Sequence, residues 1–244
     1  MSTSCFAERL GHYIDLSVAE EAALERLELN ERAYRKGAVI RREKEAVQEL
    51  FIVKKGWAFS CALLADGGRQ ILRLHFPGDL IGTSSLAFTH AAHTLVALTD
   101  MVACPFDTAA MRDLFISYPR LAGLFFAVGQ VEHVALTDRL ASLGRTSARA
   151  PVAALLVDTR YPLRVLHPDA GNDFLFPLTQ EEIGDATGLT AVHVNRMLRA
   201  LEEAGLIQRR DGRITIPDEE RLAALAAYEN RYDSIATGWL PPAR

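Results

Sequence analysis

Residues 179–216 constrain the fold of this chain more than any other stretch. Thr179-Gln180-Glu181-Glu182 has the pattern of a capping box, in which the threonine oxygen accepts from a backbone N–H and Glu182 reaches back to the cap. The pattern predicts a helix that starts here, and Gly188 permits the left-handed turn that would end it. Thr190 can cap a second helix, so we expect two short helices joined by a tight turn.

The second predicted helix has one apolar and one largely polar side. Its spacing turns Val194, Met197, Leu198 and Leu201 inward. The outward side carries Val192, His193, Asn195, Arg196 and Arg199. We interpret this outward side as a surface that could read another molecule.

Two short runs, 206–210 and 213–216, follow this helix and are joined by Asp211-Gly212. That dipeptide is favoured in the type I′ turn of a β-hairpin, so the runs predict a hairpin wing. The alternative is two amphipathic helices that only cover a core. The order of helix, turn, helix and hairpin favours a winged helix-turn-helix.

These residues resemble the winged helix of Crp/Fnr-type bacterial transcription regulators. The matching segments are LTQEEIG at 178–184, GLT at 188–190, VNR at 194–196 and LEEAGLI at 201–207. The resemblance implies an α+β chain with an N-terminal, jelly-roll-like β-roll, a long dimerisation helix and a C-terminal winged helix-turn-helix domain. We expect the sensor domain at 1–118, the dimerisation helix and hinge at 119–145, and the DNA-binding domain at 146–244.

The composition is that of a globular protein with a local basic surface. Of the 244 residues 49% are hydrophobic and 24% are charged, and the net charge is −4. Residues 196–213 nevertheless contain five arginines and three acids. We therefore expect a basic face on an acidic protein, which suits double-stranded DNA.

The chain shows no membrane or secretion signal. No run reaches the roughly 18 uninterrupted apolar residues of a membrane helix, and the N-terminus lacks a basic patch followed by an apolar core. The three cysteines, Cys5, Cys61 and Cys104, are scattered and odd in number, which does not suit a disulfide framework. We expect a cytoplasmic protein with reduced thiols and no membrane partner, and a redox role for the cysteines stays open.

Short alternating runs between residues 38 and 105 predict a β-sandwich or β-barrel after a helical lead-in of about 30 residues. Residues 50–56, 66–72 and 76–82 resemble the cyclic-nucleotide-binding-type β-roll of the same family. The resemblance places an effector pocket just after this last segment. The candidate pocket residues are Gly82, Thr83, Ser84 and Thr94.

Members of the family that bind cyclic AMP carry a glutamate after this glycine and an Arg-Ser pair further on. Here Thr83 occupies the glutamate position, and residues 89–94 contain no arginine. A cyclic phosphate bound there would lack its main charge-assisted partner. We therefore do not expect cyclic AMP, and the sequence predicts an unidentified small-molecule effector or none.

The number of cysteine and histidine ligands limits which metal cofactors the chain could bind. An iron–sulfur cluster needs about four thiolates, more than this chain has, whereas haem needs fewer ligands and stays open. His75, His90 and His93 lie in the predicted roll, and for His90 and His93 the alternative is that they are solvated or hydrogen-bonded. A rival interpretation uses these three as ligands of a cupin-like metal enzyme. No His-x-His with a downstream glutamate supports it, so we do not expect an enzyme.

A long helix is predicted from Pro119 to about residue 143, roughly 37 Å at 1.5 Å per residue. It has two apolar sides, of which Phe125, Leu136 and Leu140 could cover the roll. The other has the near-heptad spacing of a two-stranded coiled coil: Leu121, Leu124, Val128, Val131 and Ala135. A helix buried within one domain is the alternative. A homodimer would place two reading helices about 34 Å apart on a near-palindromic site. Residues 143–146 are the predicted hinge.

Family members often use a glutamate and, four residues later, an arginine to read bases. Arg196 matches the arginine and suits guanine, whereas Val192 replaces the glutamate and could contact a thymine methyl group. His193 and Asn195 could contact bases or phosphates. Predicted phosphate contacts are Thr179, Thr190, Arg199, Arg209 and Arg210. The resemblance adds RNA polymerase as a partner, and no sequence feature separates an activator from a repressor.

Overall fold

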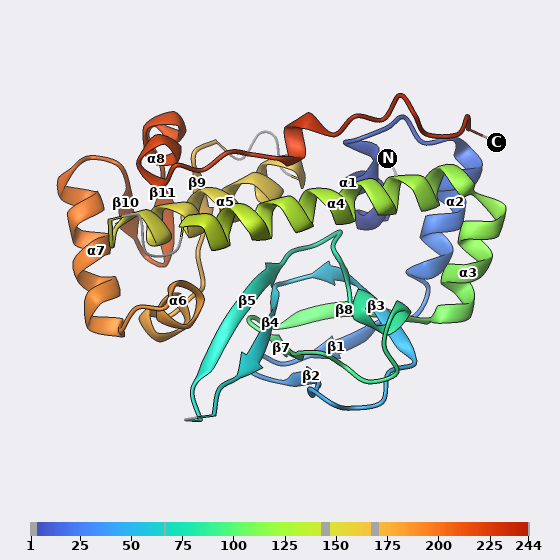
Figure 1. Ribbon diagram of the computed structural model, residues 1–244, viewed down its shortest axis with the longest axis horizontal. Coiled ribbons are helices and arrows are strands. Elements are labelled where there is room, and N and C mark those ends of the chain that lie inside the picture. The colour runs from blue at the N-terminus through green and yellow to red at the C-terminus, as the bar shows by residue number, and fades with distance from the viewer. Residues whose placement is uncertain (1–3, 66, 143–146, 167–170, 244) are drawn as a thin grey trace. The chain divides into compact units, whose positions relative to one another are not determined.

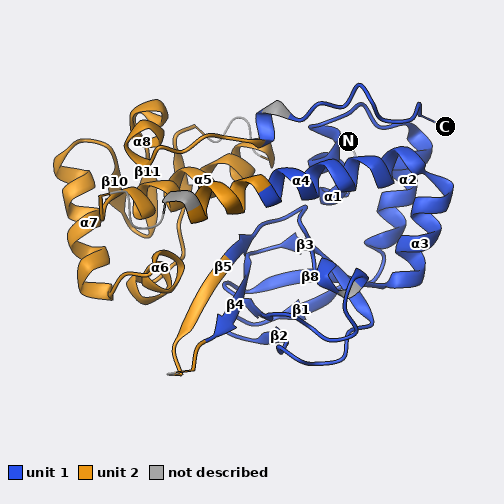
Figure 2. Cartoon of the chain, viewed as in Figure 1, with its two compact units in different colours: residues 1–63, 73–133, 232–244 blue, residues 64–72, 134–231 orange. Residues whose placement is uncertain are grey.

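The computed structural model describes residues 4–65, 67–142, 147–166 and 171–243, and its fold is α+β (Figure 1). The chain forms two compact units (Figure 2). Unit 1 contains residues 1–63, 73–133 and 232–244, and unit 2 contains residues 64–72 and 134–231. The predicted domain limits remain a proposal, and the predicted hinge at 143–146 lies outside the described residues.

Unit 1 begins with α1 (Cys5–Gly11) and α2 (Val18–Leu27). Ser4 caps α1 by accepting from the N–H of Ala7, and Ser17 forms a capping box with Glu20 at the start of α2. The side chain of Glu28 accepts from the Ser4 hydroxyl at 2.6 Å and from the N–H of Phe6 at 3.0 Å. These bonds tie the start of α1 to the end of α2.

The strands of the predicted roll form two four-stranded sheets with the orders β1-β8-β3-β6 and β2-β7-β4-β5. Their bounds are β1 (Arg32–Tyr34), β2 (Val39–Arg41), β3 (Glu49–Lys55), β4 (Ala58–Leu63), β5 (Arg69–His75), β6 (Leu80–Ile81), β7 (Thr94–Ala97) and β8 (Met101–Asp107). Phe51, Ile81 and Leu95 belong to an apolar cluster of buried side chains from both sheets. The register of β2 on β7 shifts between Val39 and Arg41, which marks a bulge.

Helices α3 (Thr108–Ser117) and α4 (Pro119–Ser142) follow the roll, with the short 3₁₀ helix η1 (Thr83–Leu86) between β6 and β7. The sequence analysis predicted α4 but not α3, which Asp107 caps by accepting from the N–H of Ala110. Leu121 and Leu124 of α4 are fully buried in a core cluster with α1, α2 and α3. The first half of α4 is thus a core helix of unit 1.

Unit 2 holds the remaining elements of the helix-turn-helix region. They are α5 (Ala150–Leu166), β9 (Asp173–Leu175), α6 (Gln180–Thr187), α7 (Ala191–Glu203), β10 (Gln208–Arg210), β11 (Arg213–Thr215) and α8 (Glu219–Ala226). Helix α5 continues through Pro162 to Leu166. Val152, Leu156 and Tyr161 are buried along its length, and this packing outweighs the hydrogen bond lost at the proline.

The chain returns to unit 1 after residue 231. This tail, residues 232–243, contains the 3₁₀ helix η2 (Tyr232–Ser234) and is otherwise irregular. Leu240 packs against the core cluster of unit 1, and a Cβ added to Gly123 of α4 would lie 2.8 Å from its Cδ2 atom.

In the described part of the chain, no single helix has the length and apolar character needed to cross a membrane. Among the described residues, only α3 and α4 taken together are long and apolar enough for a membrane span, and the two helices are bent by 116° relative to each other.

Candidate nucleic-acid interface

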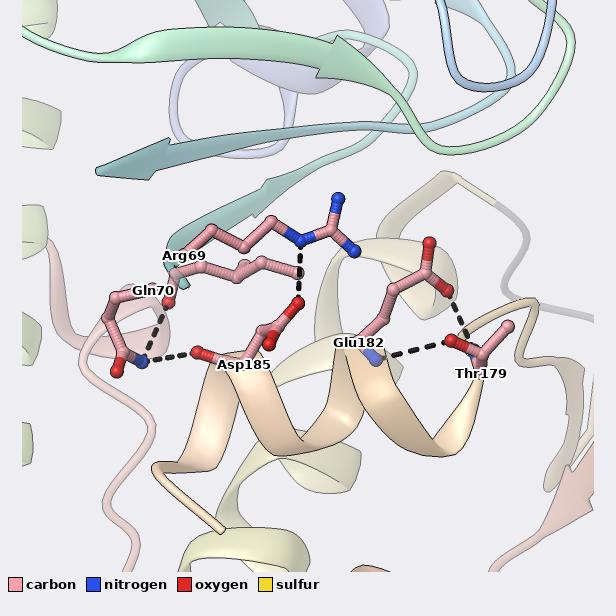
Figure 3. Close-up of polar contacts among 6 residues, drawn as sticks. Arg69, Gln70, Thr179, Glu182 and Asp185 are labelled. Atoms are coloured by element: carbon pink, nitrogen blue, oxygen red, sulfur yellow. Dashed lines mark hydrogen bonds and ion pairs between the residues drawn. The ribbon is translucent and has the colours of Figure 1, made fainter. Parts of the chain in front are cut away.

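Two capped helices and a glycine turn build the candidate interface. The Oγ atom of Thr179 accepts from the N–H of Glu182 at 3.2 Å, and the Glu182 carboxylate accepts from the N–H of Thr179 at 2.7 Å. This is the predicted capping box (Figure 3). Gly188 ends α6 with φ of 73°, and Thr190 caps α7 by accepting from the N–H of His193 at 3.3 Å. The helix-turn-helix predicted from these residues is confirmed.

Gly184 allows the turn to close tightly on α6. Its carbonyl accepts from the N–H groups of Gly188 and Leu189, at 2.8 and 3.2 Å. A Cβ added to Gly184 would lie 2.4 Å from the carbonyl oxygen of Leu189. Only glycine fits this position without moving the turn.

Helix α7 presents the face predicted to read bases. Val194, Leu198 and Leu201 are buried on its inner side. Val192 is 80% exposed, and His193 and Arg196 are also exposed, whereas Asn195 is half-buried. An apolar side chain so exposed on a capped helix suits a contact that becomes buried in a complex.

The hairpin after α7 has the predicted turn. Asp211 and Gly212 both have positive φ, 51° and 74°, as a type I′ turn requires. Strand β9 adds a third strand to this wing, giving the sheet order β10-β11-β9. Arg213 of β11 forms an ion pair with Asp173 of β9.

The arginines predicted to contact phosphates differ in exposure and in their hydrogen-bond partners. The Arg210 side chain is 91% exposed at the wing tip, and Arg199 is exposed on α7. Arg209 is instead half-buried and donates to the Glu202 carboxylate of α7 at 2.6 Å. This hydrogen bond from Arg209 lowers the pKa of Glu202. Arg209 therefore joins the wing to α7, a role that the sequence analysis did not foresee.

Unit 2 also contains a polar contact between β5 and α6, here called the hairpin clasp: Arg69, Gln70, Arg139 and Asp185. Arg69 Nε donates to the Asp185 carboxylate at 2.6 Å, and the amide of Gln70 donates to the Asp185 carbonyl (Figure 3). Arg139 of α4 donates to the carbonyls of Leu72, at 3.0 Å, and Ala186. The clasp connects a strand of the predicted sensor to the first helix of the predicted reading module.

The candidate effector residues surround the start of η1. Gly82 precedes η1 with φ of 79°, Thr83 is exposed and Ser84 is half-buried. Thr94 is buried, and its Oγ1 atom accepts from the N–H of Glu43 at 3.0 Å. A side chain that the sequence analysis missed lies here as well: an added Cβ on Gly82 would be 3.1 Å from Nη1 of Arg41.

The histidines proposed as metal ligands lie in different environments. His75 is buried in β5, and burial lowers its pKa to about 3, so the ring is neutral. His90 and His93 are exposed, and His90 Nδ1 lies 3.0 Å from Oγ1 of Thr89. Within the described residues no three His, Cys, Asp or Glu side chains form a group that could hold a metal ion. The cupin-like interpretation therefore has no structural support.

The three cysteines lie in buried or half-buried positions and form no disulfide with one another. Cys61 and Cys104 are buried, and burial, followed by the nearby Glu28, raises the pKa of Cys104 to about 11. Burial also raises the pKa of Cys5, whose thiol lies 3.5 Å from the carbonyl oxygen of Lys54.

The predicted dimer stripe on α4 needs a correction. Leu121 and Leu124 are fully buried in their own chain, and Val128 packs against the same core, while Val131 and Ala135 are half-buried. The heptad spacing of the first residues reflects packing within unit 1. The large exposed apolar side chains of α4 are instead Phe126, Val134, Leu136 and Leu140, which are 40 to 64% exposed.

Comparison with known proteins matches both halves of the chain. Residues 31–118 match the family described as cyclic nucleotide-binding domain, and residues 152–225 match the Crp-like helix-turn-helix domain. The nitrogen fixation regulation protein FixK of Bradyrhizobium diazoefficiens is 31% identical over 192 residues, 78% of this chain and 79% of that protein. The fumarate and nitrate reduction regulatory protein of Escherichia coli K12 is 24% identical over 195 residues, 79% of this chain and 77% of the relative.

A solved structure agrees with these matches. FixK2 from Bradyrhizobium japonicum is 27% identical, with a TM-score of 0.73 over 82% of this chain and 98% of that one. The similarity therefore covers the roll, the long helix and the winged helix-turn-helix together.

Proposed function

Because the chain belongs to the Crp/Fnr family of DNA-binding transcription regulators, we propose that it binds a near-palindromic DNA site as a homodimer and inserts α7 of each protomer into the major groove. The observation that carries this proposal is the exposed face of α7. Val192, His193 and Arg196 project from a helix whose opposite side is fully packed. Both ends of that helix are defined, by the Thr190 cap and by the wing contact of Glu202.

Within this face, Arg196 reads a guanine through its O6 and N7 acceptors. Val192 contacts a thymine methyl group, because it cannot accept the hydrogen bond that a glutamate would take from cytosine. His193 and Asn195 contact neighbouring bases or phosphates. The half-site should therefore keep the family's arginine-read guanine and differ where the glutamate would read.

Phosphate contacts come from the rim of this face. Arg199 and Arg210 are exposed, although Arg210 lies 3.4 Å from the Asp211 carboxylate. Thr179 and Thr190 lie at the N-terminal ends of α6 and α7, where backbone N–H groups favour anions. Arg209 contributes by holding the wing against Glu202. Its loss should disturb the wing as well as remove a positive charge.

The regulator responds to a small-molecule effector in the roll, and the hairpin clasp carries the response to α6. Arg69 and Gln70 belong to the segment matched as a cyclic nucleotide-binding domain, whereas Asp185 belongs to the matched helix-turn-helix. A shift of β5 would change the contacts that fix α6. DNA-bound dimers then act on transcription through contact with RNA polymerase.

The test compares Arg196→Ala with Arg210→Ala on a site selected from random DNA. Arg196→Ala should cost about 1–3 kcal/mol and relax specificity at one base pair, because it removes a base contact. Arg210→Ala should weaken all sequences alike and reduce the slope of log affinity against log salt by about 1. Fluorescence anisotropy with single-base variants of the site measures both effects.

Arg42→Ala is the matched control, since this exposed arginine lies in the roll rather than on the reading face. It should leave affinity and specificity unchanged. Equal, sequence-independent losses for Arg196→Ala and Arg210→Ala would remove Arg196 from the base-reading set.

A further inference from the structure

Arg41 is a buried arginine at the end of a strand of the roll. Only 7% of its surface is exposed, whereas Val39, two residues earlier on the same strand, is 42% exposed. This reverses the order expected for an apolar and a charged residue, and charged groups are rarely buried without a partner.

A bulge in β2 accompanies this reversal. Val39 pairs with Val96, but Arg41 pairs with Leu95, so the strand contains one residue more than its partner between the two pairs. Bulges of this kind re-aim a side chain. The backbone irregularity therefore coincides with the residue whose side chain is turned inward.

The contacts of Arg41 leave much of its binding capacity unused. Its Nη2 atom donates to the carbonyl of Glu49 at 2.5 Å, and the guanidinium lies 5.0 Å from the centre of the Phe51 ring. A guanidinium has five N–H donors, and its flat edge suits two oxygens of one anion. Arg41 forms no ion pair with any residue that the structure describes. The carboxylate of Glu49 pairs instead with Arg32.

Arg9, another buried arginine of unit 1, has an acidic partner. Its guanidinium lies 3.5 Å from the Asp79 carboxylate, and both side chains are less than a tenth exposed. The negative charge of Asp79 offsets the loss of water around Arg9. Arg41 has no carboxylate in ion-pair contact, and burial lowers its pKa although the more distant Glu49 and Glu45 oppose the shift.

We propose that Arg41 is the anion-binding residue of the roll and that the effector carries a carboxylate or phosphate group, which pairs with this guanidinium. Gly82 lies beside it, and a Cβ there would come within 3.1 Å of Nη1. The residues that follow Gly82 are not buried: Thr83 is exposed and Ser84 is half-buried. The inference rests on the proposed role of the roll as an effector domain and names the chemistry of the ligand.

The site explains how an anion could be bound although residues 89–94 contain no arginine. The charge comes from β2, some 40 residues earlier in the chain, instead of from the loop after η1. Thr94 accepts from the N–H of Glu43, which ties the residues after Arg41 to β7. A bound anion would thus pair with the Arg41 guanidinium, which its hydrogen bond to the Glu49 carbonyl already positions.

The experiment measures thermal unfolding of the full chain with inorganic phosphate, succinate or sodium chloride at equal ionic strength. Phosphate or succinate should raise the melting temperature of the wild type above its value in chloride, and the more effective probe identifies the ligand group. Arg41→Gln should lose this rise, whereas Arg42→Gln, which removes an exposed neighbouring charge, should keep it. In chloride alone Arg41→Gln should melt close to the wild type, because it removes a buried charge that forms no ion pair.

A wild-type melting temperature that neither probe raises above chloride would overturn the proposal, whatever the variants do. An equal rise in Arg41→Gln would also overturn it, because the anion would then bind elsewhere. DNA binding is measured separately in chloride. A chain that binds its DNA site but shows no anion effect retains the proposed function and loses only this inference, and the converse result would leave Arg41 as an anion site in a protein that does not bind DNA.

Discussion

At the scale of single residues, Gly184 is a position in the turn where only glycine fits. An alanine there would place its Cβ 2.4 Å from the Leu189 carbonyl oxygen, which is backbone and cannot move aside alone. Gly184→Ala should therefore destabilise unit 2 by about 1–3 kcal/mol and weaken DNA binding with it. Urea unfolding followed by circular dichroism measures the change.

Gly11→Ala is the matched control for this substitution. Gly11 is also helical, and the nearest atom to an added Cβ is 4.0 Å away. Alanine should be neutral or slightly stabilising there, because it has the higher helix propensity. If the two substitutions cost the same, the close approach at Gly184 does not decide the turn.

Residues whose roles depend on their neighbours in sequence were predictable, and those that depend on distant neighbours were not. The Thr179 cap, the Gly188 turn and the Asp211-Gly212 turn follow from local backbone chemistry. Arg209 looked like a phosphate contact because nothing in the sequence places Glu202 beside it. Arg41 was missed for a similar reason, because only strand pairing reveals the bulge that buries it.

At the scale of elements, the hairpin clasp sets how β5 and α6 act together. The Arg69 and Asp185 side chains are 36% and 26% exposed, so their ion pair is partly screened. Arg69→Ala and Asp185→Ala should each weaken DNA binding, and the double substitution should do little more than either one. We expect a coupling of about 0.5–1 kcal/mol from the double-mutant cycle, read in both DNA affinity and unfolding.

Arg35 and Asp100 supply the control pair. They are 3.2 Å apart, but their side chains are 90% and 65% exposed. The same cycle should show coupling near zero for this pair. Additive effects of Arg69→Ala and Asp185→Ala on DNA affinity would mean that the clasp carries no signal to α6.

Element types were easier to predict than element limits. The long helix, the wing and the capped helices were expected from periodicity and turn residues. Helix α3 was missed, and α5 continues through Pro162 because buried side chains such as Tyr161 stabilise it past a residue that usually interrupts a helix.

At the scale of the whole molecule, we expect self-association to depend on the exposed apolar side chains of α4. Leu136 and Leu140 are 52% and 58% exposed, and burying each leucine in a dimer is worth roughly 1.5–3 kcal/mol at most. Leu136→Glu with Leu140→Glu should therefore give a monomer that loses tight binding to a near-palindromic site. Sedimentation velocity and anisotropy measure the two effects.

Ile116→Glu is the control for this pair, because Ile116 of α3 is 68% exposed and lies outside α4. It should leave the dimer intact. A double glutamate variant that still sediments as a dimer would move the interface away from these residues. The sequence analysis expected Leu136 and Leu140 to cover the roll and the other stripe to form the dimer, because apolar spacing alone does not say which stripe a chain buries within itself.

The packing of the C-terminal tail on unit 1 affects the order in which the two units can fold during synthesis. Leu240 packs into the core cluster of unit 1, yet it leaves the ribosome after every residue of α6, α7 and the wing. Domains generally fold during synthesis in the order in which they emerge. Here the DNA-reading module can be complete while the unit that precedes it still lacks part of its packing, so the nascent regulator would acquire its reading surface before its sensor is finished.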